Sequence, residues 1–278
     1  MKTFIQIKEF SEEVRRLPKP IGYVPTMGYL HEGHLSLARR ARQECASVVA
    51  SIFINPTQFA PQEDLSSYPR NLPHDLEMLE STSVDLTWTP TVEEIYPAGF
   101  NTWVVVEGLS KRLEGEHRPD HFRGVTTVVA KLFHLVGAQK AYFGQKDAQQ
   151  LAVIRQMTRD LNIPIEIVAC PTVREQDGLA MSSRNTYLST DERLSASVLF
   201  RALMAAKDKF LHGERGGDNL RSAMEEVLAS EPLARKQYVS CADVESLEEL
   251  NYVVNKALLS MAVFIGKTRL IDNFILEE

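Results

Sequence analysis

Short apolar runs alternate with amphipathic stretches from the start of the chain. Apolar residues recur at helical spacing within 7–17, and prolines end that segment before the apolar run 21–25. A second helical pattern covers 35–46. Residues 48–54 are β-branched and apolar without polar alternation, as expected of a strand that is covered on both faces. This order predicts a β-α-β unit.

The same alternation continues to about residue 173. It predicts helices over 72–82, 122–137 and 147–161, and strands over 84–90, 102–107, 140–144 and 165–173. The intervening loop 55–70 is too long and too rich in proline for a tight crossover, so we expect it to have a function. Strands that alternate with helices favour an α/β fold, a Rossmann-like, mostly parallel sheet flanked by helices.

The pattern changes after residue 173. Ser189 and Glu192 form a capping box that opens a long predicted helix over 191–213, and a glycine-rich break separates it from a second helix. The remaining residues predict three strands, over 237–244, 259–266 and 268–276. We therefore expect two domains, a Rossmann-like domain over 1–173 and a smaller α+β domain over 174–278.

Composition and charge exclude several classes of partner and cellular setting. The chain has 278 residues, and its 31 basic and 37 acidic side chains give a net charge of -6, which argues against a nucleic-acid partner. No stretch resembles a secretory signal or a membrane span, so we expect no membrane partner. The three cysteines are odd in number and far apart, which favours a reducing, cytoplasmic setting over a disulfide framework.

The segment MGYLHEGH follows the predicted strand 21–25 directly. His31 and His34 lie three residues apart at the start of a helix, beside backbone N–H groups and the positive end of the dipole. Gly28 and Gly33 leave room for a ligand near the backbone. The pattern indicates an anion, most simply a phosphate. Zinc is disfavoured because HExxH needs spacing of four, and a surface turn with two incidental histidines is the remaining alternative.

Two further segments offer phosphate-binding groups. GQKDAQQ also follows a strand and begins a helix, with Lys146 as a point charge and Asp147 as a cap, although, taken alone, an ordinary glycine turn with an exposed lysine is the simpler explanation. Ser182, Ser183 and Arg184 lie in GLAMSSRN at the expected domain junction, where a serine-rich linker is the simpler explanation.

Other segments are less specific. The segment HRPDHFRG (117–124) either places positive charge over a phosphate-rich ligand or is a solvated loop. Asn55, Gln58 and Phe59 offer neutral groups that suit a hydroxylated or amide-forming substrate. Walker-type, dinucleotide and serine-nucleophile motifs are absent from the sequence.

Taken together, the motifs resemble a known family. PTMGYLHEGHLSLARRA, FINPTQF, EDLSSYPR, HFRGVTTVVAKLF, FGQKDAQQ and GLAMSSRNTYLS occur in the order found in the pantoate–β-alanine ligases, the pantothenate synthetases, of the HIGH-motif nucleotidyltransferase superfamily. The resemblance covers nearly the whole chain. Asp120 and His134 depart from the family pattern, as does GAQK (137–140), and this affects the expected geometry of the loop 117–123.

The resemblance implies a two-step reaction. The carboxylate of pantoate would attack the α-phosphate of ATP to give pantoyl adenylate and pyrophosphate, and the amine of β-alanine would then displace AMP to form pantothenate, a precursor of coenzyme A. Mg²⁺ would accompany ATP. The family association also suggests a homodimer, with the first domain binding the nucleotide and pantoate and the second covering the active site.

The resemblance also implies roles for individual residues. His31 and His34 are expected to contact the ATP phosphates, with His34 as the proton donor, and Lys146, Ser182, Ser183 and Arg184 to assist catalysis. The nucleotide-binding set would be Met27, Gly28, Tyr29, Leu30, His31, Glu32, Gly33, His34, Gly144, Gln145, Lys146, Asp147, Val173, Met181, Ser182, Ser183 and Arg184. Gln58 and Gln150 are expected to bind pantoate.

Two other functions stay open at this point. A nucleotidyltransferase that joins AMP to a phosphorylated acceptor would use the same HxGH motif, and a non-catalytic ATP-binding module would retain the same pocket. Both histidines and both glutamines occur together in the chain, which favours the ligase.

Overall fold

The computed structural model describes residues 1–277, which divide into two compact units. Unit 1 comprises Met1–Lys111, Gly115–Gly144 and Val153–Pro171. Unit 2 comprises Arg112–Glu114, Gln145–Ala152 and the chain from Thr172 onward. The units are therefore not two successive halves of the sequence. Among the described residues, no helix combines the length and the apolar character needed to span a bilayer.

Unit 1 is built on a six-stranded sheet in which every pair is parallel. Its strands are β1 (Lys2–Phe4), β2 (Ile21–Thr26), β3 (Ser47–Ile52), β4 (Leu86–Trp88), β5 (Lys140–Gly144) and β6 (Glu166–Cys170). They lie in the order β1-β4-β3-β2-β5-β6. This arrangement, together with the small antiparallel sheet described below, confirms the predicted fold class.

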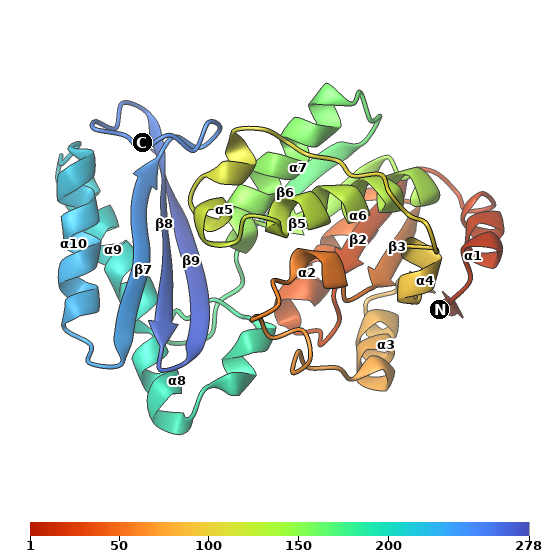
Figure 1. Ribbon diagram of the computed structural model, residues 1–278, viewed down its shortest axis with the longest axis horizontal. Coiled ribbons are helices and arrows are strands. Elements are labelled where there is room, and N and C mark those ends of the chain that lie inside the picture. The colour runs from red at the N-terminus through yellow and green to blue at the C-terminus, as the bar shows by residue number, and fades with distance from the viewer. Residues whose placement is uncertain (278) are drawn as a thin grey trace. The chain divides into compact units, whose positions relative to one another are not determined.

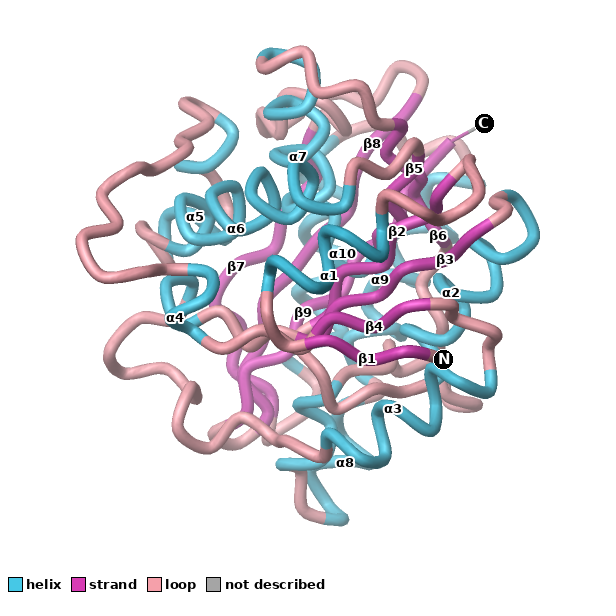
Figure 2. Tube along the Cα trace, turned by 90° about the vertical axis from the view of Figure 1, so that its right-hand side faces the viewer, coloured by secondary structure: helices cyan, strands magenta, loops and turns pink. Residues whose placement is uncertain are grey.

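Helices cover both faces of this sheet, as Figure 2 shows. The helices of the chain up to residue 160 are α1 (Ile7–Val14), α2 (Glu32–Glu44), α3 (Leu72–Ser81), α4 (Val92–Ile95), α5 (Glu114–His117), α6 (His121–Val136) and α7 (Ala148–Asp160), and α5 and α7 begin with residues of unit 2. α2 and α3 pack against one face through a core that includes Leu37, Ala41 and Leu79. α6 covers the other face, where the ring of Phe133 meets those of Tyr23 and Phe143. Apolar residues thus lie on both sides of the strands, as the unbroken apolar runs predict.

The strand order places the turn after β2 where the direction of the strand connections reverses. β3, β2 and β5 are neighbours, and β2 pairs with β5 through Gly22↔Lys140 and Tyr23↔Ala141. The chain runs from β2 outward to β3 and β4, then returns to β5 on the other side of β2. Ligands in open parallel sheets bind beyond the carboxyl ends of strands at such a reversal. The turn after β2 begins at this point.

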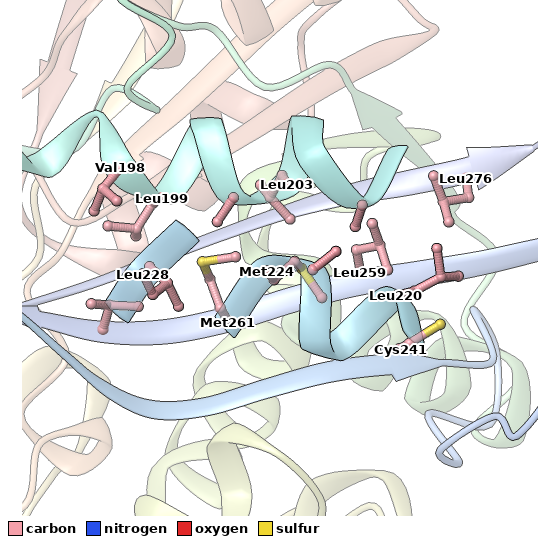
Figure 3. Close-up of a cluster of buried hydrophobic side chains, with 14 of the residues drawn as sticks. Val198, Leu199, Leu203, Leu220, Met224, Leu228, Cys241, Leu259, Met261 and Leu276 are labelled. Atoms are coloured by element: carbon pink, nitrogen blue, oxygen red, sulfur yellow. The ribbon is translucent and has the colours of Figure 1, made fainter. Parts of the chain in front are cut away.

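Unit 2 contains a three-stranded antiparallel sheet, β7 (Ala234–Ala242), β8 (Lys256–Ile265) and β9 (Thr268–Glu277), in the order β7-β8-β9. Its helices are α8 (Thr190–Ala196), α9 (Val198–Leu211) and α10 (Gly217–Ala229). Figure 3 shows the core between the helices α9 and α10 and this sheet, with Leu203, Met224 and Leu259 among the buried side chains. In Figure 1 both helices lie on the same side of the three strands.

Two predictions of local structure are wrong. Residues 102–107 form no strand, because the backbone of Val104 bonds instead to hydroxyl groups of α6: its N–H donates to Thr127 Oγ1 (3.0 Å) and its carbonyl accepts from Thr126 Oγ1 (2.6 Å). The long helix predicted over 191–213 is divided into α8 and α9 at Ser197. The capping box at Ser189 and Glu192 is present as predicted.

Candidate active site

The turn between β2 and α2 has an uncommon backbone conformation, which is stabilised by hydrogen bonds to one buried carboxylate. Gly28 and Tyr29 have φ angles of 82° and 50°, both in the left-handed region, which is uncommon for tyrosine. Asp75 of α3 is 1% exposed, and its two carboxylate oxygens accept the N–H groups of Tyr29 (2.8 Å) and Leu30 (2.7 Å). This clamp fixes the turn immediately before His31.

His31 and His34 form the N-terminal cap of α2. His31 Nδ1 accepts from the backbone N–H of Gly33 (3.1 Å), and His34 Nδ1 accepts from the backbone N–H of His31 (3.3 Å). The two rings lie side by side with their centroids 4.1 Å apart. The pair is a capping box in which imidazoles replace the usual hydroxyl and carboxylate groups.

The cap determines which ring nitrogen carries the proton. In a neutral imidazole one nitrogen accepts a hydrogen bond and the other donates. Because Nδ1 accepts from the backbone in both His31 and His34, Nε2 is the N–H donor of each ring. Two N–H donors beside the positive end of a helix dipole are suited to bind and stabilise an anion.

The sequence alone does not predict the role of Asp75. It lies in the first turn of α3, where an aspartate usually complements the helix dipole from the surface, so its position gave no signal of a buried role. Burial raises the pKa of Asp75, and the hydrogen bonds from Leu30 and Tyr29 act in the opposite direction. Its carboxylate therefore links α3 to the turn before His31.

We expect Asp75→Asn to destabilise the protein by about 1–2 kcal/mol. The amide keeps one acceptor oxygen but turns an NH₂ group toward the second backbone N–H, so that one buried donor loses its partner. Chemical denaturation of the two proteins measures the difference. Glu77→Gln, a change of the same kind on the same helix, is the control and should leave stability within about 0.5 kcal/mol. Equal stability of Asp75→Asn and wild type would contradict the clamp.

The loop that follows β3 places Gln58 in a network of polar side chains. Gln58, in the 3₁₀ turn η1 (Pro56–Gln58), is 8% exposed; its Oε1 accepts from Asn55 Nδ2 (3.1 Å) and its Nε2 donates to Met27 Sδ (3.1 Å). Asn55 also donates to the carbonyl of Gly124 in α6 (3.1 Å) and accepts from Tyr96 Oη (2.8 Å). The structure thus brings Gln58 together with Met27, at the start of the turn after β2.

The segment HRPDHFRG supports this loop. Arg118 forms a two-pronged ion pair with Glu63 (2.6 and 2.7 Å), and His121 Nδ1–H donates to the backbone carbonyl of Gln58 (2.9 Å). Arg118 Nη2 donates to the same carbonyl (3.3 Å). Burial favours a higher pKa for Glu63, but the hydrogen bond and charge of Arg118 outweigh it and lower that pKa. The sequence indicates that this segment is charged, but it does not predict that Arg118 and His121 contact Gln58.

The other candidate phosphate-binding segments belong to unit 2. Gln145, Lys146 and Asp147 form the 3₁₀ turn η3 between β5 and α7. Ser183 and Arg184 begin the 3₁₀ turn η4 (Ser183–Tyr187), which Ser182 caps by accepting the N–H of Arg184 (3.3 Å).

Val173 and the two adjacent glutamines also lie in unit 2. The carbonyl of Val173 accepts the N–H of Met181 (3.0 Å), so that these two candidates lie side by side. Gln149 is buried and bonds to the backbone of Arg112 (2.6 Å) and Glu114 (2.9 Å), whereas its neighbour Gln150 is partly exposed. Residues 1–277 contain no group of three or more His, Cys, Asp or Glu side chains arranged to hold a metal ion.

The candidate residues divide between the two units. Unit 1 holds the turn and helix start from Met27 to His34, together with Gln58 and Gly144. Unit 2 holds Gln145–Asp147, Gln150, Val173 and Met181–Arg184.

Comparison with known proteins gives one consistent result. Residues 1–275 match the family profile described as pantoate-beta-alanine ligase. A pantothenate synthetase from Roseiflexus sp. (strain RS-1) is 58% identical over 277 residues, and the match covers 100% of both chains. A pantothenate synthetase from Moorella thermoacetica is 52% identical over 277 residues.

Solved structures agree with the sequence comparison. The crystal structure of pantothenate synthetase from Thermus thermophilus has a TM-score of 0.95 and 49% identity, and the match covers 99% of both chains. A pantoate-beta-alanine ligase from Francisella tularensis, complexed with beta-gamma ATP and beta-alanine, has a TM-score of 0.80 and 35% identity, and the match covers 99% of this chain and 97% of that one.

Proposed function

The chain belongs to the pantoate-beta-alanine ligase family, and from this premise we propose that it joins pantoate to β-alanine through a pantoyl adenylate. A carboxylate oxygen of pantoate attacks the α-phosphorus of ATP and pyrophosphate leaves. The amine of β-alanine then attacks the acyl carbon and loses a proton, and AMP leaves. The products are pantothenate, AMP and pyrophosphate.

The observation that carries this proposal is the pair of histidines at the start of α2. Adenylation concentrates negative charge around the α-phosphate in its transition state, and donors that are already in place stabilise such charge most effectively. The Nε2–H groups of His31 and His34 are such donors, because the cap fixes both rings through Nδ1. His34 serves as the principal donor to the transferring group.

The remaining roles follow the family resemblance. Met27–His34 and Gly144–Asp147 bind the nucleotide, with Lys146 on its phosphates, and Val173 offers backbone contacts to adenine. Met181–Arg184 bind the triphosphate through the two serine hydroxyls and the guanidinium, which suits bidentate contact with phosphate. Gln58 and Gln150 bind pantoate, and the network around Gln58 supports a fixed orientation of its amide.

The proposal extends to the setting of the reaction. Mg²⁺ would enter with ATP as part of the nucleotide substrate and would offset part of the negative charge of the phosphates. Residues 1–173 act as the domain for the nucleotide and pantoate, and the α+β domain from 174 covers the active site. The working enzyme is a cytoplasmic homodimer, in keeping with the family association.

Isotope exchange tests the adenylate directly. Enzyme, ATP, pantoate and labelled pyrophosphate, without β-alanine, are expected to yield labelled ATP, because the first step is reversible while the adenylate stays bound. Omission of pantoate is the control and should abolish exchange. A folded enzyme that exchanges no label in the presence of pantoate, or a product that retains AMP after β-alanine is added, would contradict the proposal.

A further inference from the structure

Strand β9 carries two adjacent buried polar residues that the proposed reaction does not use. Asp272 is 2% exposed and Asn273 is 5% exposed, in a strand otherwise rich in apolar side chains. Successive residues of a strand point to opposite faces of its sheet. Asp272 and Asn273 therefore project from the two sides of β9, and each contacts a different segment of unit 2.

Asn273 holds the turn that contains Lys146. Its Nδ2 group donates to the backbone carbonyls of Gln145 (3.1 Å) and Lys146 (2.8 Å). A side-chain amide has two N–H donors, so both are used on this one turn. Gln145 Nε2 in turn donates to Asn273 Oδ1 (3.5 Å). The backbone on either side of the Lys146 side chain is thus fixed from the C-terminal strand.

Asp272 holds the segment that leads to the serines. Its carboxylate forms two hydrogen bonds with the guanidinium of Arg174 (2.7 and 2.9 Å), and Arg174 also donates to the carbonyl of Gly178 (2.9 Å). The guanidinium stacks 4.7 Å from the centroid of the Phe200 ring in α9. Arg174 lies next to Val173, whose carbonyl accepts the N–H of Met181. The loop that ends at the serines is therefore anchored on the same strand.

We propose that Asn273 is a positioning residue for Lys146, and that Asp272 and Asn273 together fix the spacing between the Lys146 turn and the 173–184 segment within unit 2. This inference rests on the proposed function, because it gives the C-terminal strand a role in binding the triphosphate. A lysine that is displaced by about 1 Å loses much of its effect on a transferring group, so the cost falls on catalysis as well as on stability.

Asn273→Asp is the sharpest test, since the two side chains have nearly the same shape. The carboxylate has no N–H to donate and faces two carbonyl oxygens. We expect kcat/KM for ATP to fall about tenfold or more, with a parallel loss of ATP affinity in calorimetry. Ser240→Ala is the matched control, because Ser240 lies in the same row across β7, β8 and β9, and its buried hydroxyl has no hydrogen-bond partner among the described residues. It should leave kcat/KM unchanged.

A double-mutant cycle separates positioning from general stability. If Asn273 acts through Lys146, Asn273→Asp should have little further effect on ATP affinity or kcat/KM in a Lys146→Ala background. Additive losses, or an Asn273→Asp variant within about threefold of wild type, would overturn the inference. Asn273→Ala repeats the cycle without the added charge should Asn273→Asp fail to fold. A wild-type enzyme without pyrophosphate exchange would overturn the proposed function instead, and the calorimetric cycle would still decide the role of Asn273.

Discussion

Replacing His34 with alanine is expected to lower turnover by roughly 10²-fold or more. That is the scale of loss when one donor to a developing negative charge is removed from an active site. His34 also accepts the backbone N–H of His31, so the variant should lose about 0.5–1 kcal/mol of stability as well. Steady-state kinetics with saturating pantoate and β-alanine give the turnover, and thermal unfolding gives the stability.

His34→Gln separates the two roles of this side chain. Glutamine at the third helical position can accept the same backbone N–H, as in an ordinary capping box, but it has no imidazole. The variant should recover the stability that alanine loses while turnover stays low. Turnover of His34→Ala within about threefold of wild type would show that the ring has no part in the transfer.

Gly124→Ala is expected to disrupt the loop that carries Gln58. A Cβ atom at this position of α6 would lie 2.5 Å from the carbonyl oxygen of Thr57 and 2.8 Å from the backbone nitrogen of Gln58. Both are backbone atoms, so the clash is relieved only by moving the turn η1 away from the helix. We expect a loss of about 2–3 kcal/mol in the free energy of unfolding, and a rise in KM for pantoate that exceeds the rise for ATP.

His134→Ala provides the comparison for Gly124→Ala. His134 lies on the exposed side of the same helix, so its replacement tests alanine in α6 without a clash. It should leave both KM values and the stability close to wild type. Equal effects on pantoate and ATP in Gly124→Ala would mean that the substitution disturbs unit 1 as a whole rather than the placement of Gln58.

Periodicity predicted most of the fold. The apolar runs 21–25, 48–54 and 140–144 correspond to β2, β3 and β5, because strands covered on both faces contain little but apolar residues. The edge strand β1 was not predicted, since three residues give no period. Residues 102–107 have the composition of a strand, but hydroxyl groups of α6 take the hydrogen bonds of Val104, which a local pattern does not show.

The candidate site, too, could be predicted from the sequence only where its residues are close together in the chain. The histidine cap is local in sequence, so the HxGH spacing predicted two rings on neighbouring positions of a helix start, and the structure has them 4.1 Å apart. The residues that hold the motifs in place are distant from them in sequence. Asp75 lies about 45 residues from Tyr29 and Leu30, and Asn273 about 127 from Lys146. Contacts between residues so far apart in the sequence form only in the folded protein, and the pattern of a single sequence does not predict them.

The neighbouring order of β3, β2 and β5 has a consequence for redesign. The loop 55–70, whose Gln58 we propose to bind pantoate, follows β3, whereas the histidine cap follows β2, so the two belong to different crossover connections. On these proposed roles, we expect substitutions within 55–70, with Gly124 of α6 retained, to change which carboxylic acids are accepted and to leave the histidine cap in place. Because the loop and the cap follow different strands, a library of variants confined to 55–70 is the most direct way to seek ligases for other hydroxy acids.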